Sequence, residues 1–426
     1  MHVQHGTTSA VPRSRYVRRL RMPRSLLGRA LQAAGLAGAA LFAGSAGAVG
    51  LQGDNWQVDV GGIVNAYYTT VSCSGDNVGG AALAGRALGC GGEDRRTTIG
   101  NGLLPSGLIT KFKTEQEGLE IGGTVGIMVH TATSSGIAAN SGVDVRQAFF
   151  TVGTAEMGTF KLGRDYGIFG SNAILNDMTL LGAGAPVQAT QRGRVTLGHI
   201  GAGYTYLDHY GQIAYTSPTL GGGFTFTGAV VSPVDAGSYV SRSVPQFQAQ
   251  LAYQNDMFKF WVGGKYQKFY SNSTVSIPDP NSTNEIIIIA PGDEFNTAAG
   301  EVGASITAGQ FGALVNVQSG KGIGILTDGD QGETKGVNYL VQGTYKFTDK
   351  LKLGLNYGLS KNRDDDLYND VYNGSFKSNS NATLGLYYAL TKSVTLVGEI
   401  GQTRSKDYLD NTAKMWGGAL GGIIFF

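Results

Sequence analysis

The 426-residue sequence predicts an all-β fold, a transmembrane barrel of 16 antiparallel strands. Three observations lead to this prediction. Apolar and polar residues alternate with a period of two along most of the chain, which is the pattern of half-buried strands. The connections between these segments are short and long in turn. After the N-terminal region, no apolar run is long enough to form a membrane-spanning helix.

The N-terminal region, residues 1–48, reads as a cleaved secretory signal peptide. It contains seven arginines and no Asp, Glu or Lys. An apolar run of small residues, 33–43, follows the basic stretch and leads into Ser45-Ala46-Gly47-Ala48. We therefore expect cleavage after Ala48 and a single mature domain, 49–426. Met22 is an alternative start, which would give a signal peptide of ordinary length.

Removal of the signal peptide reverses the sign of the net charge. The whole chain has 33 basic and 31 acidic residues, whereas residues 49–426 keep 26 basic residues (33 − 7) against the same 31 acids. The net charge changes from +2 to −5. The basic character of the precursor therefore belongs to its leader, and the composition does not indicate nucleic-acid binding.

Alternation is clearest in 245–254, 338–347 and 350–360, where Leu, Tyr and Phe occupy one face and Gln, Asn, Thr and Gly the other. A polar face with so little charge fits a wet lumen better than a solvent-exposed sheet. The predicted strands are 54–72, 105–115, 118–131, 143–153, 158–165, 207–217, 222–232, 245–254, 258–270, 296–308, 310–320, 335–347, 350–361, 378–389, 393–405 and 414–426.

Seven short turns alternate with eight long loops between these strands. The long connections are 73–104, 132–142, 166–206, 233–244, 271–295, 321–334, 362–377 and 406–413. Short periplasmic turns and long surface loops are typical of an outer-membrane barrel. Closure of the barrel satisfies every backbone group in lipid and leaves no strand edge exposed.

The chain has two cysteines, Cys73 and Cys90, in one Gly-rich stretch of the first long loop. Because a signal peptide directs the protein to an oxidising compartment, we predict a disulfide bond between them. Metal binding by the two thiols is the weaker alternative, since no histidine lies near them in the sequence.

Two segments resemble those of a known family. Arg146-Gln147-Ala148-Phe149-Phe150 through Gly158-Thr159-Phe160-Lys161-Leu162-Gly163-Arg164 is similar to the hairpin of strands 4 and 5 in Gram-negative trimeric porins. The final strand ends at Phe426, like the outer-membrane assembly signal of that family.

The resemblance implies a homotrimer in the outer membrane, in contact with lipid and lipopolysaccharide and inserted by the barrel-assembly machinery. It implies passive diffusion of small hydrophilic solutes and ions, with no cofactor, no metal and no enzymatic activity. It also implies that the third surface loop, which starts at Asp165, folds inward and narrows the lumen. The predicted constriction residues on this loop and the facing wall are Lys111, Lys113, Glu115, Arg146, Arg164, Asp165, Asp177, Arg192 and Arg194.

Six of these residues are basic, and together with Asp144 the acids number four. Because a narrow channel focuses the field of nearby charges, this excess predicts a weak preference for anions. The alternation places Arg164 on the lipid face with Phe160 and Leu162, so its place in the lumen requires a bulge at the strand end.

Two other functions are compatible with a barrel. A substrate-selective uptake channel requires a ladder of aromatic or charged residues, and only Lys259, Trp261 and Lys265 share a candidate lumen face. A barrel enzyme requires a nucleophile or an Asp–His pair, and His130, His199 and His209 are the histidines left after cleavage. The aspartates of the later loops, such as Asp328, Asp330 and Asp364–Asp366, are expected to be solvated. The run Ile286–Ile289 is expected either to cover the mouth or to contact a neighbouring subunit.

Overall fold

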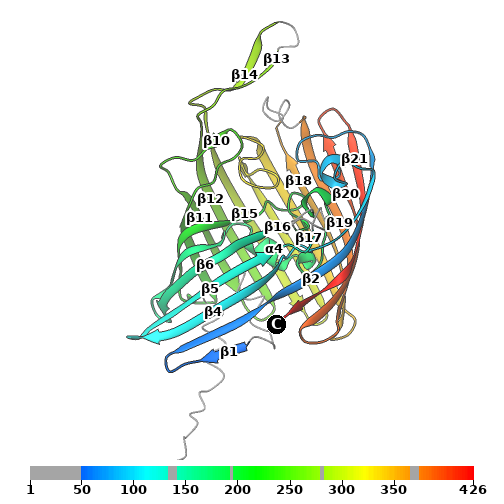
Figure 1. Ribbon diagram of the computed structural model, residues 1–426. Coiled ribbons are helices and arrows are strands. Elements are labelled where there is room, and N and C mark those ends of the chain that lie inside the picture. Colours follow the sequence, from blue (N-terminus) through cyan, green and yellow to red (C-terminus); the bar gives the residue numbers. More distant parts are fainter. Residues whose placement is uncertain (1–48, 133–141, 192–194, 279–282, 365–373) are drawn as a thin grey trace, which may run out of the picture.

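The computed structural model describes residues 49–132, 142–191, 195–278, 283–364 and 374–426. Within them, 16 long antiparallel strands pair in chain order and close into a barrel (Figure 1). These strands are β2 (Trp56–Gly75), β4 (Ser106–Gln116), β5 (Leu119–Val129), β6 (Val143–Thr154), β7 (Gly158–Tyr166), β8 (His209–Thr216), β9 (Phe224–Val231), β11 (Gln246–Gln254), β12 (Phe258–Ser271), β15 (Glu294–Ala308), β16 (Phe311–Lys321), β17 (Lys335–Lys346), β18 (Leu351–Asn362), β19 (Phe376–Ala389), β20 (Val394–Asp407) and β21 (Thr412–Phe425).

The barrel closes between its first and last strands. β21 pairs with β2 from Ile63↔Phe425 to Gly75↔Ala413. Beyond that ladder, the backbone of Phe426 exchanges hydrogen bonds of 2.8 and 3.1 Å with Gly62. The short strand β1 (Val49–Gln52) then continues the same edge beside β2. The end of the chain and residue 49 therefore lie next to each other on one side of β2.

All the predicted strands are confirmed, and their ends differ from the predicted ones by at most three residues. The smaller elements were not predicted from the sequence. These are β1, β3 (Arg95–Gly100), β10 (Tyr239–Val240), β13 (Val275–Pro278), β14 (Glu285–Ile289), α3 (Arg86–Gly89), α4 (Ser171–Asn176), η1 (Met178–Leu181) and α5 (Gln188–Gln191). Each has too few residues to show a period, so alternation does not detect them.

The predicted faces of the strands are also confirmed. On β17, Tyr339 and Val341 are 41% and 53% exposed on the outer surface, whereas Asn338 and Leu340 are fully buried inside. Asn, Gln and Thr side chains face inward on β11 and on β16–β19 in the same way. This inner polar surface is not simply wet, because much of it is hydrogen-bonded to loops that enter the barrel.

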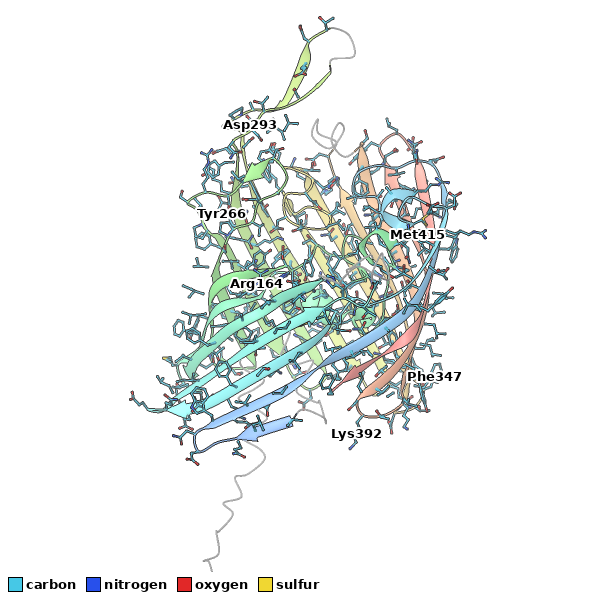
Figure 2. The ribbon with its side chains drawn as sticks, in the orientation of Figure 1. Arg164, Tyr266, Asp293, Phe347, Lys392 and Met415 are labelled. Carbon is cyan, nitrogen blue, oxygen red and sulfur yellow. A yellow bond between two sulfur atoms is a disulfide. The ribbon has the colours of Figure 1, made fainter. Side chains whose placement is uncertain are left out.

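The two ends of the barrel differ. Figure 2 shows Phe347 and Lys392, which belong to short turns, at the lower end, and Asp293 at the opposite end. There the antiparallel pair β13–β14 extends beyond the rim of the barrel (Figure 1). Because this hairpin points away from the barrel, the segment containing Ile286–Ile289 does not cover the mouth. The short turns mark the periplasmic end and the long loops the outer surface.

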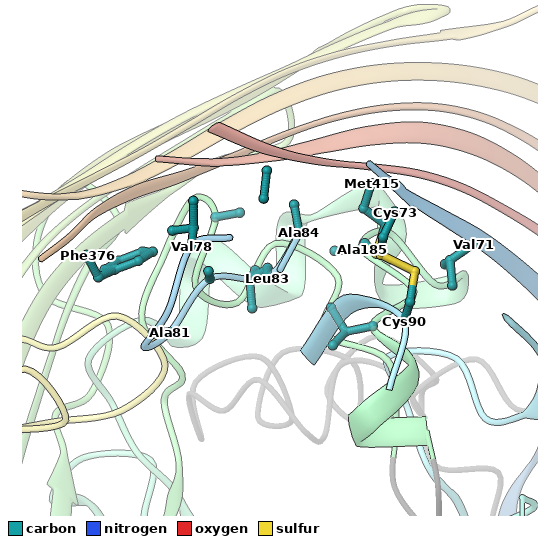
Figure 3. Packing of buried hydrophobic residues seen from close by; sticks show 14 of the residues in the cluster. Val71, Cys73, Val78, Ala81, Leu83, Ala84, Cys90, Ala185, Phe376 and Met415 are labelled. Atoms are coloured by element: carbon teal, nitrogen blue, oxygen red, sulfur yellow. A yellow bond between two sulfur atoms is a disulfide. The ribbon is translucent and has the colours of Figure 1, made fainter. Parts of the chain in front are cut away.

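Loop 1 (residues 76–94) folds into the outer mouth of the barrel, where only the third loop was expected. Its buried residues, among them Val78 and Leu83, pack with Phe376 and Met415 of the wall and with Ala185 (Figure 3). A disulfide bond joins Cys73 of β2 to Cys90 and ties the end of this loop to the wall. The composition gave no sign of this packing, because the loop buries mostly alanine and glycine.

Loop 1 is also hydrogen-bonded to the wall. Asn379 on β19 accepts the N–H of Leu83 at 3.1 Å and donates to the carbonyl of Ala81 at 2.8 Å. Ser405 on β20 accepts the N–H of Ala84 at 2.9 Å. These contacts satisfy backbone groups that the loop buries, which explains how an irregular segment lies inside the barrel.

Loop 6 (residues 322–334) enters the barrel as well. The Asp330 carboxylate accepts the N–H groups of residues 325, 326 and 327 at 2.8 to 3.2 Å. Asp328 forms a buried ion pair with Lys265 of β12. Burial raises the pKa of both carboxyls above the ordinary value, although Lys265 and the backbone N–H groups counteract this effect. The prediction that Asp328 and Asp330 are solvated is therefore wrong.

Candidate functional site

Loop 3 (residues 167–208) crosses the lumen and is fixed to the inner wall at several strands. On β11, Gln248 accepts the N–H groups of Ile168 and Phe169 at 2.7 and 3.0 Å. On β17, Gln342 accepts the N–H of Met178 at 2.7 Å. The glutamines of the polar strand faces thus hold the backbone of this loop in place.

The strongest anchor of loop 3 is Glu399 on β20. Its carboxylate accepts the N–H groups of Ala183 and Gly184, both at 2.8 Å, and the hydroxyl of Tyr387 at 2.6 Å. A side chain at position 182 would collide with this carboxylate, because a Cβ there would lie 2.0 Å from Oε1. Gly182 therefore permits the close approach of loop and wall.

Within loop 3, the fully buried Asp177 joins the two halves of the loop. It accepts the N–H of Thr179 at 2.9 Å and the hydroxyl of Tyr204 at 2.8 Å, and lies 3.1 Å from Nδ1 of His199. Burial by itself raises the pKa of the Asp177 carboxyl, but His199 and these hydrogen bonds outweigh it and hold the pKa below the ordinary value. Asp177 therefore stabilises the fold of the loop, and its side chain is fully buried.

A cavity of about 670 Å³ lies between loop 3 and the wall formed by β2, β5 and β6. On the wall side it is lined by Ile63, Met128, Arg146 and Gln147, together with Leu104. The loop 3 side is mainly aliphatic and consists of Ile174, Leu175, Leu180, Val195, Leu197, Ile200 and Leu207. A second cavity of about 330 Å³ lies towards the short turns, and Leu175 and Leu180 line both cavities. These two leucines therefore lie between the two cavities.

A polar cluster lines the first cavity beside its aliphatic part. Nε of Arg146 lies 2.8 Å from Asp144, and one terminal nitrogen lies 3.4 Å from the Tyr206 hydroxyl. His209 lies between two carboxylates, with Nδ1 3.3 Å from Asp208 and Nε2 3.6 Å from Asp144. Asp144 and Asp208 remain about a third and a quarter exposed. The cluster therefore presents charges of both signs to the lumen.

A β-bulge on β6 produces this arrangement. Gly126 of β5 pairs with Gln147 and Ile127 pairs with Val145, so Arg146 has no partner in the ladder. The extra residue turns the side chains of both Arg146 and Gln147 inward, and both line the cavity. A bulge was predicted at Arg164, but the bulge in the structure is at Arg146.

Arg164 lies on the outer face of the barrel, so its assignment to the constriction is wrong. It pairs with Ala148 in a ladder without a register shift between β6 and β7, and both residues are exposed. Its Nε donates to the carbonyl of Val145 at 3.0 Å. With no bulge in that ladder, Arg164 keeps the same face as Phe160.

The other predicted residues separate into three groups. Lys111 and Lys113 lie on the lumen face of β4, opposite Asp59 and Gln57 of β2, and Glu115 lies beside the short turn at the periplasmic rim. Asp165 is buried in an ion pair with Lys161 at 2.6 Å and accepts a hydrogen bond from Gln147 at 2.9 Å. Arg192 and Arg194 lie outside the described residues. The predicted ring of facing charges is therefore not assembled as a unit.

Several residues of the site were not predicted from the sequence. They include Glu399, Asp208 and the leucines of loop 3. Glu399 had a signal, since it is an acid on the inner face of a predicted strand. Its importance was not visible because its partners are backbone groups of loop 3, more than 200 positions away. The leucines had no periodic pattern, because they lie in irregular and short helical segments.

No group of acidic, cysteine and histidine side chains suited to a metal ion occurs among the residues that the structure describes. In the same part of the chain, no helix is both long and apolar enough to cross a membrane.

The closed barrel, the outward apolar surface and the loop fixed across the lumen define a channel of the outer membrane. The comparisons with known proteins agree. The family model described as Gram-negative porin matches residues 34–408, so the chain belongs to the Gram-negative porin family. It is a passive diffusion channel for small hydrophilic solutes and ions.

Solved structures share the fold at low sequence identity. The outer-membrane channel DcaP of Acinetobacter baumannii is 16% identical, with a TM-score of 0.63 over 89% of this chain and 100% of that one. The anion-selective porin from Comamonas acidovorans is 16% identical, with a TM-score of 0.60 over 87% and 100%. OmpF of Salmonella typhi, in a complex with daunomycin, is 17% identical, with a TM-score of 0.56 over 89% and 100%. No curated protein sequence matches the chain.

Proposed function

We propose that the chain forms a general diffusion pore whose narrowest part lies between loop 3 and the wall of β2, β5 and β6. The observation that carries this proposal is the attachment of loop 3 to Gln248, Gln342 and Glu399, which leaves the cavity as the passage. A passage bounded on one side by a fixed loop limits solutes by size and by the charges near it.

The pore prefers anions weakly, as the sequence suggests, but for a different reason. Lys346 and Lys352 line the inner cavity, and Lys111 and Lys113 face the lumen on β4. In the same region Asp177 is buried and hydrogen-bonded within loop 3. Lys111 is offset by Asp59 and Arg146 by Asp144, so the other three lysines of the periplasmic half supply the positive potential.

The functional unit is a homotrimer, produced by cleavage after Ala48 and by insertion through the barrel-assembly machinery. Large apolar residues on the outer faces of β2, β4, β5 and β21 support a lipid-facing or subunit-facing surface. They include Tyr68, Leu108, Ile127, Trp416 and Leu420. Phe426 itself is 38% exposed, so the terminal ring is available on the outside of the barrel. Lipopolysaccharide surrounds the outer half.

The alternatives have less support. The Asp177–His199 pair of a barrel enzyme would need access to substrate, yet both side chains are completely buried in loop 3. A substrate-selective channel would need a continuous ladder of charges along the lumen. Lys265 is instead paired with Asp328, and Trp261 is buried and donates to Asn316 at 3.1 Å. Neither residue is available to a solute.

Replacing Arg146 with glutamate is expected to shift the reversal potential across a KCl gradient towards cation selectivity. The change would place a third carboxylate beside Asp144 and Asp208 in the outer cavity, where now one guanidinium offsets them. The measurement is a planar bilayer recording of residues 49–426, in which the wild type is expected to open in steps of three with weak anion selectivity.

Arg164→Glu is the matched control for this experiment. It makes the same charge change on the neighbouring strand, but on the outer face of the barrel. Its reversal potential is expected to equal that of the wild type. Equal shifts in the two variants would contradict the assignment of Arg146 to the passage, and absence of conductance in the wild type would contradict the proposed function.

A further inference from the structure

The first cavity is lined mainly by aliphatic side chains, where the sequence predicts charges. We name six of them the apolar collar and define it as Ile63, Leu104, Met128, Leu175, Leu180 and Leu197. Ile63 and Met128 belong to the wall, and they pack in one cluster with Ile109 and with Leu181 of loop 3. The collar is therefore a built feature to which both the wall and the loop contribute.

Loop 3 is held in this position by polar contacts behind the collar. Tyr67 of β2 donates to the carbonyl of Leu181 at 2.5 Å, and the N–H of Leu103 donates to the carbonyl of Gly182 at 2.8 Å. Glu399 fixes the next two residues. Of the collar, Leu104, Leu175 and Leu197 are half-buried and remain open to the cavity, and the other three residues are buried behind them.

The apolar collar changes which solutes enter the first cavity. An ion or a sugar must give up part of its hydration beside the leucines and gains no hydrogen bond in return. A solute with an alkyl or aryl body instead buries apolar surface there, and each methylene removed from water favours its entry by about fourfold. A collar of this kind therefore favours solutes that carry an apolar part.

The polar cluster at the same cavity defines the rest of the solute. The partly exposed carboxylates of Asp144 and Asp208 can accept from an ammonium group, and the Arg146 guanidinium can donate to a carboxylate. Charged groups of both signs lie within a few ångströms of each other, in the cavity that the collar lines. A zwitterion with an apolar body matches the two parts of the cavity together.

We propose that the channel favours small zwitterions with an apolar body, such as free amino acids with aliphatic or aromatic side chains, over polar solutes of equal size. The apolar collar accepts the body, and the Asp144–Arg146–Asp208 cluster receives the charged groups. This inference rests on the proposed diffusion function and adds a solute class to it.

The test compares free leucine with free asparagine, two zwitterions of nearly equal size, by swelling of liposomes that contain residues 49–426. Free leucine is expected to enter about fourfold faster than free asparagine, as for about one buried methylene. In the Leu175→Asn variant the ratio is expected to fall to about one, because the collar becomes polar where it borders both cavities. Equal or slower entry of leucine into wild-type liposomes would overturn the proposal.

Leu390→Asn is the control, since Leu390 is 46% exposed in a short turn outside the passage and its replacement should leave the ratio unchanged. Asp208→Asn tests the cluster and is expected to slow both amino acids relative to glucose. An unchanged ratio to glucose would overturn the role of the cluster. Heat-dependent migration on gels confirms that each variant is folded. Liposomes that admit glucose but show no preference for leucine contradict this inference alone, whereas liposomes closed to glucose contradict the proposed function itself.

Discussion

Replacement of Glu399 with leucine is expected to loosen the attachment of the centre of loop 3 to the wall and to raise the single-channel conductance. The carboxylate accepts three hydrogen bonds, two from the loop backbone and one from Tyr387. A buried N–H group left without an acceptor costs about 1–3 kcal/mol, so the loss of the two loop contacts weakens this attachment by about 2 kcal/mol or more. Gln248 and Gln342 hold the first part of the loop, and Tyr67 still holds Leu181. Ser360 and Gln318 accept backbone N–H groups from its last part. The replacement therefore releases the stretch around Ala183 and Gly184.

The measurement is the amplitude and noise of single openings in planar bilayers. A loop that moves relative to the wall should produce larger and noisier openings than the wild type. Glu399→Gln is the matched control, because its amide oxygen still accepts a hydrogen bond, and it should lie between the two. If Glu399→Leu folds and conducts with wild-type amplitude and noise, loop 3 does not limit the passage.

Replacement of Lys161 with methionine is expected to cause the largest loss of stability. Lys161 and Asp165 form an ion pair at 2.6 Å in the wall below the polar cluster, with side chains 5% and 2% exposed. Methionine would leave the buried Asp165 carboxylate with only the hydrogen bond from Gln147. Removing one partner of a buried pair costs about 3–5 kcal/mol.

The double variant Lys161→Met with Asp165→Leu separates this effect from a loss of packing. It removes both charges and should recover most of the lost stability, because an apolar pair of similar volume can replace a buried ion pair. Urea-induced unfolding in lipid vesicles measures the difference. Equal stability of the single variant and the wild type would show that Asp165 does not depend on Lys161.

The strands could be predicted because one physical constraint governs nearly every position in them. Lipid requires apolar residues outside, so Tyr339 and Val341 alternate with Asn338 and Gln342, and each long strand shows the period. The ends of the strands are marked by Gly, Asn and Asp in turns. The prediction therefore differs from the structure by a few residues only.

The site could be predicted only in part, because it depends on contacts between distant segments. The sequence indicated that Arg146 faces the lumen, but not the bulge that also turns Gln147 inward. It indicated that loop 3 enters the barrel, but not that Asp177 would be used to fold the loop. The anchoring of Ala183 and Gly184 by Glu399 joins residues with no local relation, and alternation carries no information about it.

The apolar collar shows the same limit. Leu175 and Leu180 stand in short helical segments, where the sequence shows aliphatic residues without any sign of the surface they meet. The wall residues Ile63 and Met128 look like ordinary inward positions of two strands. Only the course of loop 3 brings the two sets to one cavity.

The most direct test of a diffusion pore narrowed by loop 3 is the entry of neutral sugars of increasing size into liposomes that contain residues 49–426. The rates are expected to fall steadily from a pentose through a hexose to a disaccharide and a trisaccharide, and to rise in proportion to concentration for each sugar. Liposomes that do not swell, or that take up one sugar in a saturable manner, would contradict a general diffusion pore.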